Sequence, residues 1–373
     1  MSNRLWETFK ELSDIYSPSY GEREFCDALC RRLTCLGISF REDNAAEIIN
    51  GNCGNLFGSI SGSLSGSPLL FSAHMDTVEP AKGKHAVLQE DGTILPEGNT
   101  ILGADDVAGI AVILEAITRL KEQKVPHRPI ELLFPVAEER YGVGSAVFDY
   151  SHIKAKEAYV LDLSGAIGEA SNAAPTILSF EIKIHGKASH AGFAPEDGIH
   201  AIMVAAKAIT QLPQGEPVSG LTFNIGQIAG GESSNIVPAV CAVKGEIRSL
   251  DHEAVLSYWK RVTTVFHTEA ETEGARIEAE KQMKITAYET PLASSVVRRF
   301  VRACEKTGVP PHIHSTFGGS DQNNFALHGI TGLVIACSMH EAHSIREHSN
   351  LRELEDCVAL VMKLMTDRED EQE

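Results

Sequence analysis

Apolar and polar residues follow two different spacings along the first part of this chain. Apolar residues recur at helical spacing through most of the opening 40 residues and again over residues 106–123. Short continuous apolar runs predict buried strands over residues 55–61, 68–76, 129–139 and 157–165. Because strands and helices alternate here, we expect an α/β fold with a mixed, largely parallel sheet flanked by helices. Functional groups are then expected at the carboxyl ends of its strands.

The pattern changes near residue 175 and changes back near residue 288. Between these points, strands are predicted at 176–190, 222–230, 239–250 and 275–287, and helices at 200–212 and 253–271. This β-α-β-β-α-β order is that of a ferredoxin-like α+β sandwich, which is complete in itself. We therefore expect a domain of residues 176–288 inserted into a domain formed by residues 1–175 and 289–373.

Composition and charge limit the classes of partner that such a protein is expected to bind. The chain has 373 residues, 43% of them hydrophobic, which is enough for two domains with a core each. Its formal net charge of −18 predicts no nucleic-acid partner and no binding to anionic membranes. The sequence shows no apolar stretch of about 20 residues, no secretory signal and no C-x-x-C pair among its eight cysteines. We expect a cytoplasmic protein without a disulfide framework.

A histidine and an aspartate end the apolar run at residues 68–76. Residues two apart on an extended strand point to the same side, so His74 and Asp76 are expected to face one place at the strand's carboxyl end. A histidine whose second ring nitrogen is held by a carboxylate is a good metal ligand. The polar start of an ordinary loop explains the same pair without any function.

Acidic residues and histidines stand at several other predicted element ends. In chain order they are Asp105, Asp106, Glu138, Glu139, Asp162, His340, His343 and His348. Each has a plain structural reading, because aspartates cap helices and adjacent charged residues are common at surfaces. Gathered at one rim of a parallel sheet, however, the carboxylates would repel one another, and bound cations are the simplest remedy. Mixed imidazole and carboxylate ligands suit zinc, and also manganese or cobalt.

The motifs around these residues resemble those of a known family. "SAHMDT", "GADD" before a helix, "AEER", "LD" at a strand end and a late H-x-x-x-E occur in the order and spacing of the co-catalytic two-zinc exopeptidases. This superfamily includes peptidase T, the glutamate carboxypeptidases and the aminoacylases. The segment "GKASHAGFAPEDGIHA" resembles the family's lid, and "LGADD" and "GGSDQNNF" are most similar to the peptidase T branch.

The resemblance implies two divalent metal ions as cofactors, most simply Zn²⁺, with Co²⁺ or Mn²⁺ as alternatives. His74 and Asp162 are implied to hold one ion and Glu139 and His343 the other, while Asp105 bridges both. Three ligand carboxylates and a bridging hydroxide would neutralise the four positive charges of two Zn²⁺ ions, as a buried site requires.

The resemblance assigns further roles close to these ligands. Asp76 is implied to orient His74, and Glu138 is implied to be the general base. The peptide bond between Asp105 and Asp106 is implied to be cis, although neither residue is a proline.

The resemblance also implies contacts with the substrate. His190 is implied to stabilise the tetrahedral oxyanion, often from the partner subunit of a dimer. Asn235 and Arg248 resemble the family's contacts with a substrate carboxylate, although Arg248 fits an exposed strand residue equally well. A substrate-lining loop, which otherwise reads as an ordinary glycine turn, is implied for Gly318, Gly319, Ser320 and Asp321.

The expected activity is metal-dependent hydrolysis of a peptide bond in small peptides. The enzyme is expected to be a homodimer joined through the inserted domain and most similar to peptidase T-like aminopeptidases. A carboxypeptidase or an N-acyl-amino-acid deacylase could use the same two ions. A metal-binding protein without turnover is a more distant alternative, and Glu138 beside Glu139 argues against it because a scaffold needs no base.

Overall fold

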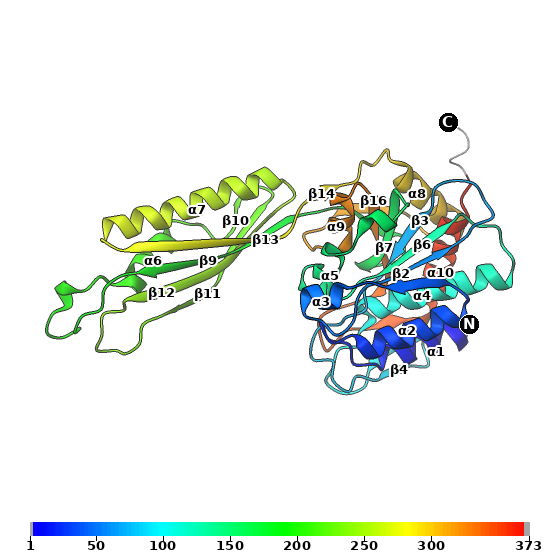
Figure 1. Ribbon diagram of the computed structural model, residues 1–373, viewed down its shortest axis with the longest axis horizontal. Coiled ribbons are helices and arrows are strands. Elements are labelled where there is room, and N and C mark those ends of the chain that lie inside the picture. Colours follow the sequence, from blue (N-terminus) through cyan, green and yellow to red (C-terminus); the bar gives the residue numbers. More distant parts are fainter. Residues whose placement is uncertain (1–2, 369–373) are drawn as a thin grey trace. The chain divides into compact units, whose positions relative to one another are not determined.

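The computed structural model describes residues 3–368, which divide into two compact units (Figure 1). The larger unit contains the described residues up to Ala173 and from Glu289 onward. The inserted unit runs from Ala174 to Tyr288. Each unit has its own sheet and its own hydrophobic core.

Among the described residues, the larger unit is built on a mixed sheet of nine strands. Their order is β1 (Ser39–Glu42), β2 (Leu56–Ile60), β6 (Ile130–Phe134), β3 (Leu69–Ser72), β7 (Glu157–Ser164), β16 (Thr331–Met339), β8 (Glu169–Ala174) and β14 (Tyr288–Glu289), with β15 (His312–Ser315) beside β8. The central strands β6, β3, β7 and β16 are mutually parallel, whereas β2 and β8 flank them in the antiparallel sense. The predicted mixed, largely parallel sheet is confirmed, and the carboxyl ends of its central strands meet at one edge.

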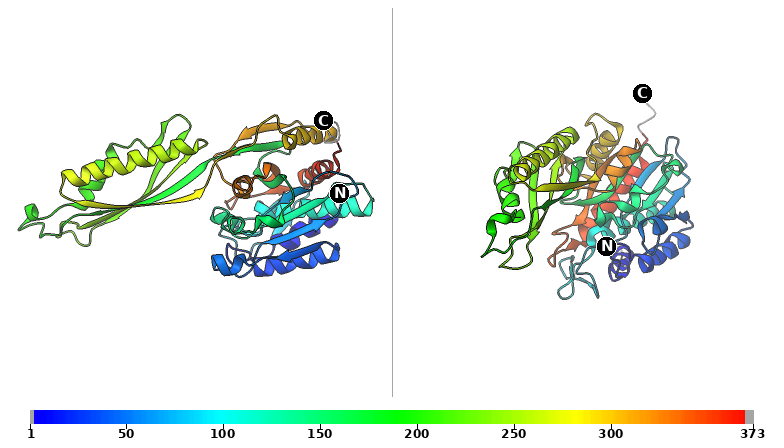
Figure 2. Two further views of the ribbon diagram at one scale, coloured as in Figure 1. Left: turned by 45° about the horizontal axis from the view of Figure 1, so that its top comes forward. Right: turned by 60° about the vertical axis from the view of Figure 1, so that its left-hand side comes forward.

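Both faces of the central strands are buried, because successive side chains point to opposite sides. Phe71 and Leu161 face the main core, to which six helices contribute: α1 (Asn3–Ser13), α2 (Arg23–Cys35), α3 (Ala45–Ile49), α4 (Ala104–Glu122), α8 (Ser295–Thr307) and α10 (Leu351–Thr366). Leu70 and Val160 face a smaller core that includes Phe325 of α9 (Asp321–Leu327). Helices therefore lie on both sides of the sheet (Figure 2).

The opening helix predicted from the sequence is in fact two helices. The segment between α1 and α2 contains Pro18, which has no N–H to donate, and Tyr20, whose φ is 70°. The helix predicted at residues 106–123 is α4. Within residues 3–368, no helix combines the length and the apolar character needed to cross a membrane.

Short elements fill the connections of the larger unit. A small sheet has the order β17 (Ser349–Asn350), β5 (Thr93–Pro96) and β4 (Ala86–Leu88). Single helical turns are formed by α3 (Ala45–Ile49), α5 (Val143–Ala146), η1 (Glu138–Arg140) and η2 (Tyr150–His152). The η1 turn begins shortly after the end of β6 at Phe134 and carries both glutamates that the sequence singles out.

The inserted unit is an antiparallel sheet with two helices. The strand order is β10 (Gly215–Val218), β11 (Leu221–Gly230), β12 (Val240–Ser249), β9 (Thr176–His185) and β13 (Arg276–Ile285). Helices α6 (Ala201–Thr210) and α7 (His252–Thr272) pack on it around one core, and η3 (Pro195–Asp197) is a short turn. The predicted β-α-β-β-α-β order is present. The additional edge strand β10 was not predicted because its sequence, GEPV, is short and polar.

Candidate active site

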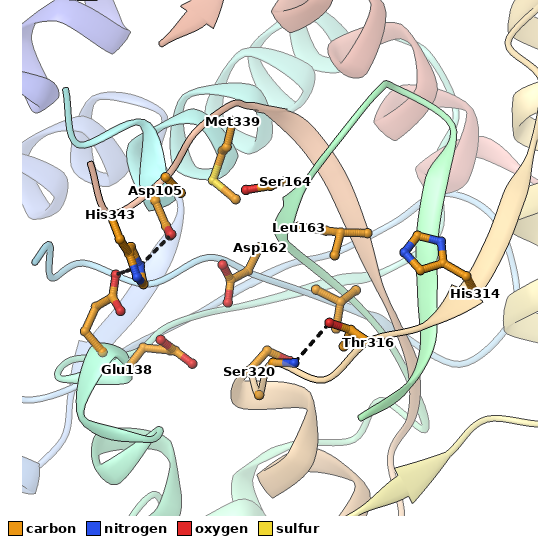
Figure 3. Close-up of a pocket in the computed structure, with 15 residues that line it drawn as sticks. Asp105, Glu138, Asp162, Leu163, Ser164, His314, Thr316, Ser320, Met339 and His343 are labelled. Carbon is orange, nitrogen blue, oxygen red and sulfur yellow. Dashed lines mark hydrogen bonds and ion pairs between the residues drawn. The ribbon is translucent and has the colours of Figure 1, made fainter. Parts of the chain in front are cut away.

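A cavity of about 440 Å³ opens in the larger unit at the carboxyl ends of the central strands. Its wall includes five of the residues that the sequence singles out: Asp105, Glu138, Glu139, Asp162 and His343. Figure 3 shows Asp105 and His343 together on one side of this cavity, with Asp162 next to them. The topology therefore brings together side chains that lie far apart in the sequence.

His74 lies just beyond β3, which ends at Ser72, and its ring is buried. Its Nδ1 is 2.9 Å from the backbone carbonyl oxygen of Asp76 and 3.4 Å from Oδ1 of the same residue. A carbonyl only accepts, so Nδ1 carries the proton and donates it. The lone pair of Nε2 therefore points toward the cavity side, 2.9 Å from Oδ1 of Asp105, and is available to a metal ion.

Asp105 lies between two imidazoles. Its Oδ1 is 2.9 Å from Nε2 of His74, and its Oδ2 is 3.2 Å from Nε2 of His343. On the first side, Oδ1 of Asp162 is 3.9 Å from Nε2 of His74. On the second side, Oε1 of Glu139 is 2.9 Å from Nε2 of His343. The five side chains thus form two halves that share one aspartate.

The carboxylates and imidazoles at this site are close enough to share metal ions. One ligand atom each from His74, Asp105 and Glu139 lie within 4.8 Å of one another, and the same holds for His74, Glu138 and Asp162. Burial raises the pKa of Glu138 well above its ordinary value, and nearby carboxylates including Glu139 add to the rise. Burial likewise raises the pKa of Asp162, with Asp105 adding to it. Crowded buried acids beside imidazoles fit divalent cations, which would relieve this repulsion.

Asp76 holds two parts of the site at once. Its Oδ1 accepts a hydrogen bond of 2.8 Å from the backbone N–H of Glu138, and its Oδ2 accepts one of 3.2 Å from that of Glu139. The hydroxyl of Ser19 donates to the same Oδ2 at 2.7 Å. The sequence pattern predicted that Asp76 would face His74, but it missed that the backbone carbonyl is the nearer partner and that the carboxylate fixes the turn of the two glutamates.

The loop that carries Asp105 is held by a residue for which the sequence suggested no role. Glu347, noted only as the end of the H-x-x-x-E motif, accepts hydrogen bonds from the backbone N–H groups of Leu102, Gly103 and Asp105 at 2.8, 2.7 and 3.0 Å. The peptide bond between Asp105 and Asp106 is cis, as the resemblance implies. Glu347 therefore positions the backbone from which Asp105 projects.

Asp106 and Asp105 differ in what they do at the start of α4. Oδ1 of Asp106 accepts a hydrogen bond of 3.2 Å from Gly109 inside the helix, so the capping interpretation describes Asp106. Its Oδ2 accepts one of 3.1 Å from the backbone N–H of His74, which ties the helix to the loop after β3. Asp105 instead turns its carboxylate to the two histidines.

The glycine-containing loop before α9 also reaches the cavity. Gly318, Gly319 and Ser320 line it, and the Ser320 hydroxyl accepts a hydrogen bond of 3.3 Å from Gln322 at the start of α9. Asp321 does not line the cavity; it is buried and accepts a hydrogen bond from the hydroxyl of Ser145. Of this predicted group, Asp321 is the member that the structure places in a supporting position.

Within the inserted unit, His190 and Asn235 are neighbours. The backbone N–H of Ala191 donates to the carbonyl oxygen of Asn235 at 3.0 Å, and the His190 side chain is exposed. Asn235 precedes β12, whereas Arg248 lies near the carboxyl end of that strand, beside Ile177 of β9. The Nε of Arg248 is 2.8 Å from Oε1 of Glu246. The structure therefore joins two of these three predicted substrate contacts and separates the third from them.

Two family models match the chain. A model described as "Peptidase dimerisation domain" matches residues 172–273, and one described as "Peptidase family M28" matches residues 55–191. The first match coincides with most of the inserted unit, and the second includes β3, β6 and β7 and the residues His74, Glu138 and Asp162 at or just beyond their carboxyl ends.

Several known proteins are similar to this one over nearly the whole length of the chain. An uncharacterized protein of Bacillus subtilis, YqjE, is 36% identical over 362 residues, which is 97% of either chain. The crystal structure of aminopeptidase PepT from Bacillus cereus is 37% identical, with a TM-score of 0.92 over 97% of each chain. The crystal structure of a tripeptidase from Staphylococcus aureus is 31% identical, with a TM-score of 0.94 over the same share. The chain therefore belongs to the superfamily of co-catalytic two-zinc exopeptidases, in its peptidase T-like branch, and is a metallopeptidase.

Proposed function

We propose that this metallopeptidase is an aminopeptidase that cleaves small peptides, tripeptides in particular. The observation that carries the proposal is Asp105, whose two carboxylate oxygens face His74 on one side and His343 on the other. Two of the similar solved structures are described as an aminopeptidase and a tripeptidase, which supports this substrate class.

The proposed cofactor is a pair of divalent ions, most simply Zn²⁺, with Co²⁺ or Mn²⁺ as alternatives. His74 and Asp162 would hold one ion, Glu139 and His343 the other, and Asp105 both. Two ions bound in this way supply Lewis acidity, which polarises the scissile carbonyl and lowers the pKa of a water molecule.

Glu138 is the proposed general base. Its carboxyl lines the cavity, is buried and has a raised pKa, which suits a group that must take up and release a proton. It would accept a proton from the attacking water and donate it to the leaving amine. Asp76 supports this role because its carboxylate accepts a hydrogen bond of 2.8 Å from the backbone N–H of Glu138 and so holds that residue in place.

His190 is the proposed stabiliser of the oxyanion. Its Nδ1 accepts hydrogen bonds from the backbone N–H groups of Gly192 and Phe193 at 3.1 and 3.2 Å. Two donors at Nδ1 leave the proton of the neutral ring on Nε2, which makes Nε2 a hydrogen-bond donor, as an oxyanion requires. The match to a peptidase dimerisation domain supports a homodimer in which His190 serves the partner's site.

Further assignments belong to the same proposal. Residues 176–288 are proposed as the lid and dimerisation domain, and residues 1–175 with 289–373 as the catalytic domain, which the division at Ala174 and Tyr288 supports. The cytoplasmic location stays a prediction. The proposed substrate contacts are Asn235, Arg248, Gly318, Gly319 and Ser320.

A substrate panel tests the proposal. Zinc-loaded enzyme is given a tripeptide with free termini, the same peptide with an acetylated amino terminus, and the same peptide with an amidated carboxyl terminus. An aminopeptidase loses activity when the amino terminus is blocked and releases the first residue. Preferred cleavage of the acetylated peptide, or release of the last residue, would contradict the proposal and indicate a deacylase or a carboxypeptidase.

A further inference from the structure

A second group of metal-ligating side chains lies in the larger unit, outside the proposed two-metal site. Glu169 begins β8, and His312 and His314 lie two residues apart on β15. The two strands are parallel neighbours, and His312 pairs in register with Glu169. Residues two apart on a strand share a face, so both imidazoles lie on the side of the carboxylate. One ligand atom from each of the three lies within 4.8 Å of the others.

Two of these three side chains, His314 and Glu169, have polar atoms without a hydrogen-bond partner or a counter-charge within residues 3–368. Nδ1 of His314 is shielded from solvent and has no hydrogen-bond partner. Among the described residues, none donates a hydrogen bond to the Glu169 carboxylate or forms an ion pair with it. A shielded nitrogen without a partner costs free energy, and so does a carboxylate that is partly withdrawn from water without a counter-charge. A bound cation would satisfy both groups.

The surroundings leave room for the carboxylate. Gly165 has a φ of 141°, and a Cβ added there would lie 2.5 Å from Oε2 of Glu169 and 3.1 Å from its Cδ. Any larger residue at this position would be strained and would push the carboxylate aside. The absence of a side chain at Gly165 therefore keeps Glu169 next to the two imidazoles.

We propose that Glu169, His312 and His314 bind a third divalent transition-metal ion, for which Zn²⁺ is best suited. Two imidazoles and one carboxylate are the protein ligands of zinc sites that keep a fourth position for water. Ligand atoms around tetrahedral zinc lie about 3.3 Å apart, so modest side-chain rotations close the observed separations. His312 is exposed and the other two are half-buried, so the site binds more weakly than the two-metal site.

The third site shares a wall with the candidate active-site cavity. His314 lines that cavity and lies across it from His343 (Figure 3). A bound ion would fix the His314 ring on this wall and add positive charge to it. Because the ion would lie across the cavity from Asp105, we assign to it an effect on substrate binding and none on the chemical step.

Counting zinc tests the proposal. Full-length wild type, His312→Ala and Glu169→Gln are equilibrated over a series of free Zn²⁺ concentrations, and the bound metal per chain is measured. Each variant is expected to bind one ion fewer than wild type. His267→Ala, which removes an exposed histidine of α7, is the matched control and is expected to bind as many ions as wild type.

The measured quantity is a difference between variants, so it does not depend on how many ions the proposed active site holds or on which peptide is cleaved. Equal zinc content in wild type and both variants, at every concentration, overturns the proposal. An equal loss in His267→Ala overturns it too. As a second readout, excess Zn²⁺ is expected to change KM for a tripeptide in wild type and to leave KM unchanged in His312→Ala. The same change of KM in His312→Ala contradicts the assigned effect.

Discussion

The backbone N–H of Asp105 donates a hydrogen bond of 3.0 Å to the carboxylate of Glu347, which lies 242 residues later in the chain. The same buried carboxylate accepts N–H groups from Leu102 and Gly103. The segment that carries His343 therefore also fixes the loop that carries Asp105. One carboxylate, outside the proposed ligand set, thus links two proposed ligands that lie far apart in the sequence.

Replacing Glu347 is expected to weaken metal binding without removing a ligand. Glu347→Ala leaves three backbone donors without their acceptor, so the Asp105 loop loosens, and we expect metal affinity to fall by about 10–100-fold. Competition with a chelator measures the affinity. Glu341→Gln, on the same loop but exposed, is the control and is expected to bind as wild type does. Unchanged affinity in Glu347→Ala would show that the loop does not need this support.

Glu138→Gln is expected to separate catalysis from metal binding. The amide keeps the size of the side chain but cannot take up the proton of the attacking water, so we expect kcat to fall by about 10²–10⁴-fold while both ions stay bound. Glu139→Gln, its neighbour in the sequence, is expected to lose metal as well as activity. Because Glu138 also lies within 4.8 Å of His74 and Asp162, loss of an ion from Glu138→Gln would instead identify it as a ligand.

The proposed role of His190 in the partner's site is tested by mixing two inactive variants. His190→Ala is expected to lower kcat by about 10²–10³-fold, because one donor to the oxyanion is lost. If dimers of His190→Ala and Glu138→Gln exchange subunits, half of the mixed dimers' sites combine an intact Glu138 with an intact His190. Activity of about a quarter of the wild-type value is then expected after mixing. No gain on mixing, with exchange shown by mass, would place His190 in its own subunit's site.

The raised pKa of Glu22 predicts that the free energy of unfolding depends on pH. Its side chain is fully buried, and this burial raises its pKa to about 7, with a further contribution from the negative charge of Asp76. Hydrogen bonds from the backbone N–H groups of Tyr20 and Ala137 lower the pKa but do not offset the rise. Between the unfolded value of about 4.3 and this folded value, the native state keeps a proton that the unfolded state releases. The contribution of Glu22 to stability is therefore present at acid pH and is lost as the pH rises to about 7.

Glu22→Gln removes this dependence, because the amide resembles the protonated acid. We expect the variant to match wild type near pH 4 and to exceed it at pH 8 by up to about 4 kcal/mol in the free energy of unfolding. Urea unfolding of the metal-loaded proteins at the two pH values measures the difference. A variant that is less stable than wild type at pH 8 would show that the ionised carboxylate is favoured in the fold.

The positions of Glu138 and Asp162 could be predicted because apolar runs mark buried strands and parallel strands end at one edge. The loop beyond β3 could not be predicted, since alternation of side chains describes a strand, and β3 ends at Ser72 before His74. His74 and Asp76 still meet, but through a backbone carbonyl that no residue pattern records.

Contacts between distant segments were harder still to predict. The strands β8 and β15 are short and read EASNAA and HIHS, so neither has the apolar run that identifies a buried strand. Their pairing, which places His312 beside Glu169, follows from the order of strands at the far edge of the sheet. Glu347 could be recognised from the sequence as the glutamate of the H-x-x-x-E motif, but its role depends on where the Asp105 loop lies in space.

Diffraction at the absorption edge of zinc, on crystals of the zinc-loaded protein, tests the central claim most directly. We expect two strong anomalous peaks about 3.5–4 Å apart, one against each carboxylate oxygen of Asp105, with His74 and Asp162 at the first and His343 and Glu139 at the second. A single peak at this position, or fully loaded crystals with zinc bound only elsewhere, would contradict the two-metal site.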